Sequence, residues 1–149
     1  MAITDIKVVR ALKYASGTGS INGATVDMLN YEGITLIVDV DSVGASADGC
    51  TVKLECSDAA NMASAKAITG ATKSIDDYGD DSICIIDVKQ VPKRYVRVVL
   101  TKDSVRTIAA SAVYLLYNPD YKPQDSDQGN AGSDEYIDTT ILYQPTHAP

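Results

Sequence analysis

The chain has 149 residues, of which 45% are hydrophobic, and a formal net charge of −7. This length supports one domain with a buried core, and the hydrophobic content excludes a chain that is disordered throughout. The acidic balance argues against direct binding of nucleic acid, because proteins that bind phosphates present basic surfaces to them. No apolar run approaches the length of a membrane span, and Met1–Asp5 lacks the pattern of a signal peptide. We therefore expect no membrane partner and a protein made and kept in a reducing cytoplasm.

The N-terminal part of the chain predicts short strands separated by turns. Ile6–Tyr14 alternates well enough for a first strand. The residues expected on one side of it are Ile6, Val8, Leu12 and Tyr14. Asn22-Gly23 predicts a tight hairpin turn, because both residue types tolerate a positive φ. Ala24–Met28 then predicts a short strand, and Tyr31–Gly33 predicts another turn.

Two segments show the alternation of half-buried strands. Every second residue of Ile34–Asp41 is aliphatic, and the residues between them are mostly polar. Cys50–Cys56 repeats the pattern with Val52 and Leu54 facing inward, so we expect it to pair antiparallel with Ile34–Asp41.

The next part of the chain is rich in alanine and then in aspartate. Asp58–Lys66 has the composition of a short helix, with Ser57 or Asp58 as its N-cap. Nine residues are marginal for a helix of their own, so we favour irregular structure there. Ala67–Thr72 predicts a further short strand, and Asp76–Asp81 predicts an acidic turn.

The strongest strand signals are Ile83–Val88 and Lys93–Leu100, which are rich in β-branched residues. Pro92 lies between them and cannot donate to a ladder, so it marks the corner where one strand ends. We expect both strands to turn an apolar face to the core. The polar face of the second strand is expected to carry Arg94, Tyr95 and Arg97.

Thr107–Tyr117 predicts the last strand. Strands at roughly regular spacing, divided by turn signals and without amphipathic helices, indicate an all-β protein. The expected fold is an antiparallel β-sandwich of jelly-roll type, formed as a single domain by residues 1–118. Its core is expected to contain Ile34, Leu36, Val38, Val52, Leu54, Val96, Val98 and Leu100.

Residues 119–149 are predicted to be an acidic, proline-containing C-terminal arm. Six carboxylates against Lys122 give this arm a net charge of −5, which leaves −2 of the total for residues 1–118. A polar spacer precedes the apolar segment Tyr136–Tyr143, and an arm of this kind can add a strand to a neighbour's sheet edge. The alternative is that the arm folds back and covers an edge strand of its own sandwich.

Nine tyrosines, with no tryptophan and no phenylalanine, make an unusual aromatic set. Tyrosine suits surfaces that meet other surfaces, because it combines a large contact area with a polar tip. The alternative is that tyrosine merely replaces phenylalanine in the strands. The residues predicted to contact a partner are Arg94, Tyr95, Arg97, Tyr117, Tyr121, Tyr136, Ile137, Ile141, Leu142 and Tyr143.

The sequence predicts no catalytic site, no metal site and no cofactor. Cys50, Cys56 and Cys84 are expected to be small buried hydrophobes, and His147 is the only imidazole in the chain. No histidine is placed to activate a serine or a cysteine, so we do not expect an enzyme.

Three acidic segments have the oxygen ligands that Ca²⁺ prefers, but solvated turns explain all three better. They are Asp39 with Asp41, Asp76–Asp81, and Asp125–Asn130. The last begins like a calcium-binding loop, yet it has Asn130 where that loop needs glycine and Tyr136 where it needs glutamate.

Two segments resemble sequences of the small capsid cement proteins of tailed bacteriophages. The first, Asp27-Met28-Leu29-Asn30-Tyr31-Glu32-Gly33, is similar to an Asp-x-x-x-Tyr-x-Gly segment that leads into the first long strand in that group. The second, Pro92-Lys93-Arg94-Tyr95-Val96-Arg97, is similar to a segment that opens a later strand. The resemblance also includes Cys50–Ser57 and Ile85–Val88, and it covers roughly Thr25–Tyr117.

The resemblance implies a β-sandwich or jelly-roll body bound outside the major capsid protein, often as a symmetric oligomer. The predicted function is that of a virion structural protein on the capsid surface, which stabilises contacts between major capsid protein subunits. It would be made in the host cytoplasm and form a homo-oligomer, a dimer or a trimer. Two alternatives stay open: a head–tail connector or tail component, and a carbohydrate-binding β-sandwich, against which the absence of tryptophan counts.

Overall fold

The structure is a computed structural model that describes residues 5–16, 19–44, 50–75, 81–102 and 108–119. These ranges contain eight β-strands and no α-helix, and no helix in them is long and apolar enough to cross a membrane. The strands are β1 (Lys7–Ala15), β2 (Ile21–Asp27), β3 (Tyr31–Val43), β4 (Cys50–Ser57), β5 (Lys66–Ile75), β6 (Ser82–Val88), β7 (Tyr95–Thr101) and β8 (Ile108–Pro119).

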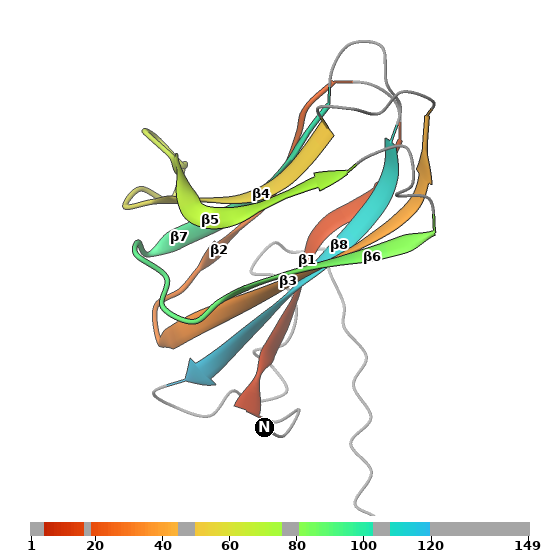
Figure 1. The fold of residues 1–149 in the computed structure, drawn as a ribbon. Helices are drawn as coiled ribbons and strands as arrows, with labels where there is room; N and C mark the ends of the chain where they lie inside the picture. The colour runs from red at the N-terminus through yellow and green to blue at the C-terminus, as the bar shows by residue number, and fades with distance from the viewer. Residues whose placement is uncertain (1–4, 17–18, 45–49, 76–80, 103–107, 120–149) are drawn as a thin grey trace, which may run out of the picture.

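The strands form two four-stranded antiparallel sheets that pack face to face as a sandwich (Figure 1). Sheet A has the order β1-β8-β3-β6, and sheet B has the order β2-β7-β4-β5. The paired strands β1·β8, β2·β7, β3·β6 and β4·β5 are nested along the chain, as in a long hairpin that has been rolled up. This strand order is that of a jelly roll. The predicted all-β sandwich is confirmed.

The core lies between the two sheets and is built by alternate residues of the strands. All eight residues predicted for it belong to one buried cluster, and each is at most 1% exposed. Cys50 and Cys56 are buried as predicted, whereas Cys84 is half-buried, and all three are free thiols. Burial raises the pKa of the Cys56 and Cys84 thiols, which favours their protonated, unreactive form.

β1 does not keep the alternation that the sequence predicts. Its register against β8 shifts twice after Arg10. Val9 and Leu12 are both buried although they have opposite parity, whereas Tyr14 is 65% exposed. The prediction of one common side along Ile6–Tyr14 was wrong, because each irregularity in the pairing changes which face the following residues occupy.

Two pairs of segments that are adjacent in the sequence lie in opposite sheets. β4 pairs with β5 and β7 in sheet B, and not with β3, so the predicted antiparallel pair was wrong. β6 and β7 are separated in the same way, because the chain crosses from the edge of sheet A to the interior of sheet B. Pro92 marks this crossing, as predicted. Alternation shows which face of a strand is buried, but it does not identify the neighbouring strand.

Asn22-Gly23 is part of β2 and not a hairpin turn. Gly23 has no positive φ, so the conformational freedom of glycine is not what this position requires. A Cβ atom at Gly23 would lie 2.3 Å from Cγ1 of Val98 and 2.4 Å from the carbonyl oxygen of Ala11. Glycine is needed there because two other strands approach its backbone closely.

Two further local predictions are corrected by the backbone. The turn before β3 lies at Met28–Asn30, where Asn30 has a φ of 78°, so Tyr31–Gly33 begins β3 instead of forming the turn. Asp58–Lys66 forms no helix, as favoured: its residues up to Ala65 form turns, and Lys66 begins β5. Met62 has a φ of 58° there, which breaks a right-handed helix.

Tyr114 of β8 connects the two sheets through the core. Its side chain is fully buried, and its hydroxyl accepts a hydrogen bond from the Val98 N–H (2.6 Å) and donates one to the Ala24 carbonyl oxygen (2.8 Å). Both are backbone groups of sheet B, at the place where the β2–β7 register shifts between Asn22 and Thr25. A bulge leaves ladder groups without a strand partner, and buried backbone groups need one. The Tyr114 hydroxyl therefore replaces a missing ladder hydrogen bond.

Replacing Tyr114 with phenylalanine should lower the free energy of unfolding by about 1–3 kcal/mol, because it leaves two buried backbone groups unsatisfied. Urea denaturation of the two proteins measures the difference. Tyr14→Phe is the matched control, because its side chain is 65% exposed. The control should change the free energy of unfolding by less than about 0.5 kcal/mol. Equal effects of the two substitutions would show that the Tyr114 hydroxyl does not stabilise the fold.

Candidate functional site

The two segments that resemble cement proteins meet at one corner of the sandwich. Arg94 donates through Nε to Oδ1 of Asp27 (2.9 Å) and through Nη2 to Oδ2 (2.7 Å). The Met28 N–H donates to the carbonyl oxygen of Arg94 at 2.7 Å. The hydrogen bonds from the guanidinium lower the pKa of Asp27, because they favour its charged form. Asp27 and Arg94 thus join the end of β2 to the start of β7.

Glu32, at the start of β3, is held by three contacts at the same corner. Its carbonyl oxygen accepts a hydrogen bond from the Val91 N–H at 3.1 Å. Its carboxylate accepts one from Gln90 Nε2 at Oε1 and one from Asn118 Nδ2 at Oε2, both at 3.3 Å. Glu32 therefore connects the β6–β7 loop to the end of β8.

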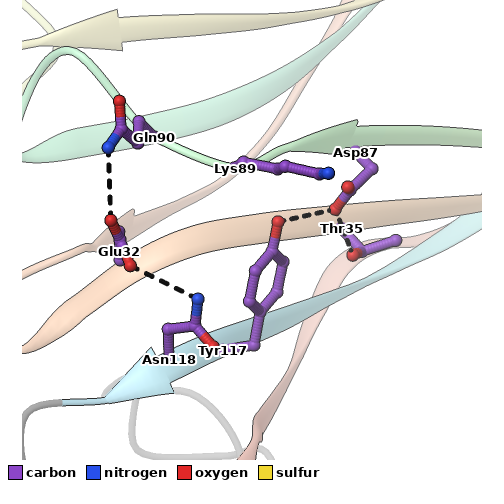
Figure 2. A pocket seen from close by; sticks show the side chains of 7 residues that line it. All are labelled: Glu32, Thr35, Asp87, Lys89, Gln90, Tyr117 and Asn118. Carbon is purple, nitrogen blue, oxygen red and sulfur yellow. Dashed lines mark hydrogen bonds between the residues drawn. The ribbon is translucent and has the colours of Figure 1, made fainter.

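An open pocket of about 970 Å³ lies beside Glu32, where β3, β6 and β8 meet (Figure 2). It is lined by Glu32, Thr35, Asp87, Lys89, Gln90, Tyr117 and Asn118. Oδ1 of Asp87 accepts hydrogen bonds from Thr35 Oγ1 (2.8 Å) and from the Tyr117 hydroxyl (2.9 Å). Burial, followed by the hydrogen bond to Asp87, raises the pKa of Tyr117 to about 12. The phenol therefore stays protonated at neutral pH and remains a donor to Asp87.

Gly33 sets the position of the Tyr117 ring. The two residues are directly paired between β3 and β8. A Cβ atom at Gly33 would lie 2.3 Å from Cζ and 2.4 Å from Cε2 of Tyr117, so the ring occupies the space of a side chain at this position. The glycine of the Asp-x-x-x-Tyr-x-Gly segment thus has a packing role, because any larger residue would displace Tyr117.

The outer face of sheet B is charged, and its charges pair with one another. Glu55 accepts hydrogen bonds from Arg97 Nη2 (3.0 Å) and Nε (3.2 Å), and Lys53 Nζ lies 3.0 Å from its other oxygen. Burial alone would raise the pKa of Glu55, but the hydrogen bonds from Lys53 and Arg97 lower it. Next to them the guanidinium of Arg94 lies 5.2 Å from the centre of the Tyr95 ring. The charged groups of Arg97, Glu55 and Lys53 therefore satisfy one another on this face.

The outer face of sheet A carries exposed apolar side chains. Ile83 and Ile85 on the edge strand β6 are 67% and 55% exposed, and Tyr14 on the opposite edge strand β1 is 65% exposed. Ile37 and Val113 lie on the two inner strands and are half-buried, and Ile37 pairs with both Ile85 and Val113. We name these five residues the sheet A patch. A groove of about 610 Å³ crosses it beside Arg10, Lys13 and Asp39. In the next row of the same face, Asp39 pairs with Ile83 and with Ser111.

The sequence analysis did not identify the sheet A patch, because it expected one apolar face of Ile83–Val88 in the core and assigned no role to the apolar residues of the other face. Ile86 is indeed buried, but Ile83 and Ile85 point outward. The sequence did contain a signal for the outward-facing isoleucines, because both the odd-numbered and the even-numbered positions of this strand carry apolar residues. Strands of that kind are covered on both faces in folded proteins. In β6 the core covers one face, and the exposed isoleucines mark the other as a candidate contact surface.

The structure places the predicted partner-contact residues on different faces. Arg94, Tyr95 and Arg97 lie at the corner and on the outer face of sheet B, whereas Tyr117 lines the pocket on sheet A. The described residues therefore do not bring these four side chains together. The other predicted contacts lie outside the described residues: Tyr121, Tyr136, Ile137, Ile141, Leu142 and Tyr143.

The acidic segments considered as calcium sites are only partly described. Asp39 and Asp41 are exposed on β3. Within the described ranges, no three or more side chains of the metal-binding types lie together. Residues 76–80 and Asp125–Asn130 lie outside those ranges, so the structure does not describe the other two segments in full.

Comparisons with known proteins inform the fold. No known protein family and no curated protein matches the sequence. The structure of the PBSX exported protein XepA is similar, with a TM-score of 0.52 at 15% identity over 96% of this chain. The chain spans only 43% of the length of XepA. The SPBc2 prophage-derived protein YomS has a TM-score of 0.45 at 10% identity, over 77% of this chain and 96% of YomS.

The structure of PirA is a further neighbour, with a TM-score of 0.41 at 9% identity, over 72% of this chain and 94% of PirA. Of the three structures, XepA alone has a TM-score above 0.5, and at 15% identity this similarity shows a shared fold and does not extend to function. The chain is an all-β sandwich, as its own two sheets show, and it shares this fold with XepA.

The pair Arg97–Glu55 should contribute a pH-dependent part of the stability. Both side chains are mostly buried, with 22% and 13% exposed, so a double-mutant cycle with Glu55→Gln and Arg97→Met should show a coupling of about 1 kcal/mol at neutral pH. The pKa of Glu55 is lowered from 4.5 in the folded protein. The coupling should therefore be complete above pH 4.5 and disappear as the pH falls through the folded-state pKa.

Urea denaturation of the four proteins of the cycle, repeated at decreasing pH, measures this coupling. The exposed pair Lys93–Asp58 is the control and should couple more weakly at every pH. A coupling between Arg97 and Glu55 that persists unchanged in acid would contradict the assignment.

Proposed function

We propose that this chain is a phage virion structural protein that binds the outside of the capsid and stabilises contacts between major capsid protein subunits. The observation that carries the proposal is the sheet A patch, which contains three of the four large hydrophobic side chains that are exposed on the described residues. The resemblance of two segments to capsid cement proteins supports it. Asp27 and Arg94, one from each of these segments, are bonded to each other.

The sheet A patch has the composition of a protein–protein interface. Its centre, Ile37 with Ile85 and Val113, is aliphatic, and polar groups flank it, since Asp39 pairs with Ile83 and Arg10 pairs with Val113. Interfaces combine an apolar centre with a polar rim in this way, and contiguous exposed apolar surface is otherwise rare on soluble proteins. The patch therefore serves as a binding surface, and the protein acts by binding and not by catalysis.

A capsid presents the same surface many times, which suits this mode of attachment. Each copy binds through a modest apolar contact, and copies that also contact one another as a homo-oligomer gain avidity from the lattice. Because the protein prefers the assembled shell over free subunits, it stabilises the shell by mass action.

Wild-type protein should bind expanded capsid shells of its phage saturably and raise their melting temperature. Co-sedimentation and thermal unfolding of the shells measure both effects. Ile83→Lys with Ile85→Lys should abolish binding, since it places two charges in the apolar contact. Thr72→Lys with Ser74→Lys is the matched control, because it adds the same charges to exposed positions on β5, the edge strand of sheet B.

The control variant should bind like the wild-type protein, and both variants should keep their free energy of unfolding. If the isoleucine variant binds like the wild-type protein, the sheet A patch is not the attachment surface. If wild-type protein does not bind the shells at all, the chain is a head–tail connector, a tail component or a carbohydrate-binding module instead.

The C-terminal arm is proposed to strengthen attachment by docking Tyr136, Ile137, Ile141, Leu142 and Tyr143 on a neighbouring subunit. β8 includes Pro119, which pairs with Tyr31, so a truncation that spares the sandwich should begin at residue 120. Deleting residues 120–149 should leave the free energy of unfolding unchanged and weaken capsid binding or oligomer formation. Urea denaturation, co-sedimentation and analytical ultracentrifugation measure these effects. An unfolded truncated protein would show that the arm covers its own sandwich, and undiminished binding would show that the arm is passive.

A further inference from the structure

The pocket in Figure 2 has a rigid wall that its own residues hold in place. The Tyr117 ring rests on the backbone of Gly33, and its hydroxyl is fixed by the 2.9 Å bond to Asp87. Thr35 holds the same carboxylate oxygen from the neighbouring strand. A ligand that enters the pocket therefore meets side chains that are already ordered, which lowers the entropic cost of binding.

The same residues leave hydrogen-bonding capacity directed to the pocket. Asp87 uses Oδ1 for both of its bonds, and no described residue donates to its Oδ2. The Lys89 ammonium extends into the pocket (Figure 2) and makes no hydrogen bond or ion pair with a described residue. Gln90 and Asn118 bond to Glu32 through their amide nitrogens, so their carbonyl oxygens remain acceptors.

The charged and polar groups that line the pocket limit which chemical groups a ligand can present to them. The two carboxylates outnumber the single ammonium, so phosphate and other anions are disfavoured. The ammonium in turn disfavours a cation beside it. Acceptors and a donor lie close together, which suits neutral groups that can both donate and accept; amides do this through two atoms, whereas a hydroxyl does it through one and fits the closer spacing. The ring of Tyr117 adds an apolar surface on one side.

We propose that this pocket binds a neutral carbohydrate, a pyranose with neighbouring hydroxyl groups. One hydroxyl donates to Oδ2 of Asp87 while it or its neighbour accepts from Nζ of Lys89, and the apolar face of the sugar packs against Tyr117. The volume of about 970 Å³ accommodates one or two sugar rings, within the range of small-molecule sites. This site is distinct from the sheet A patch, although both lie on the outer face of sheet A. The pocket contains the pair Thr35–Asp87, and the patch is centred on Ile37–Ile85, the next pair on the same face.

Titration of the ¹⁵N-labelled full-length protein with methyl glycosides tests the proposal by nuclear magnetic resonance. The probes are the glycosides of glucose, galactose, mannose and N-acetylglucosamine. At least one should shift the amide resonances of Thr35, Asp87 and Lys89 saturably, with a dissociation constant on the order of 1 mM, as expected for a ligand of this size. Asp87→Asn should weaken binding about tenfold, because it removes a charged acceptor.

Asp39→Asn is the matched control, since Asp39 is exposed on the same strand and outer face as Thr35 but does not line the pocket. It should bind the glycoside like the wild-type protein, and thermal unfolding should show that both variants are folded. The proposal is overturned if no glycoside shifts these resonances, or if Asp87→Asn binds as tightly as the control. It is also overturned if only a short peptide probe shifts them, which would make the pocket part of a protein interface. Capsid binding of the Asp87→Asn variant, measured in parallel, separates a failure of this site from a failure of the proposed attachment.

Discussion

The hydrogen bonds of the Tyr114 hydroxyl are the interaction on which the sandwich most depends. A jelly roll must keep two sheets in register although no strand pairing connects them across the core. Tyr114 starts in sheet A and ends at two backbone groups of sheet B, so it fixes the bulge of β2 against β7 from inside. Gly23 lies in the same bulge, and a side chain there would collide with the buried Val98 side chain and with the backbone of Ala11. The bulge of β2 thus combines close packing at Gly23 with hydrogen bonds from Tyr114 to buried backbone groups.

The nested strand order also explains why one corner holds so many polar contacts. The β2–β3 turn, the β6–β7 connection and the end of β8 are far apart in the sequence, but the roll brings them together. Asp27 with Arg94, and Glu32 with Gln90 and Asn118, connect these three parts of the chain. The pocket lies beside this corner, and five of its seven lining residues lie on strands, whereas Lys89 and Gln90 lie in the β6–β7 connection.

The two outer faces of the sandwich differ in what they can offer a partner. On sheet B the charged groups of Arg97, Glu55 and Lys53 satisfy one another, and a partner would have to break these contacts before forming its own. On sheet A the exposed isoleucines of β6 have no such competing contacts, so their burial by a partner carries little cost. This difference is the physical reason for placing attachment on sheet A, although the sequence analysis favoured Arg94, Tyr95 and Arg97.

The sequence by itself determined the all-β class, the central part of most strands and the inward faces of β3, β4 and β7, but not where β2 and β3 begin. These follow from alternation, which is a local property, so Leu36 and Val98 are buried as their neighbours predict. Only the tertiary structure decided which strands pair, and it places β3 and β4 in different sheets. It also decided that Tyr14 is exposed and that Ile83 and Ile85 face outward. The pocket belongs to the same group, since Gly33, Asp87 and Tyr117 come from three strands that only the roll makes neighbours. Strand pairing depends on contacts between distant segments, and no local pattern encodes them.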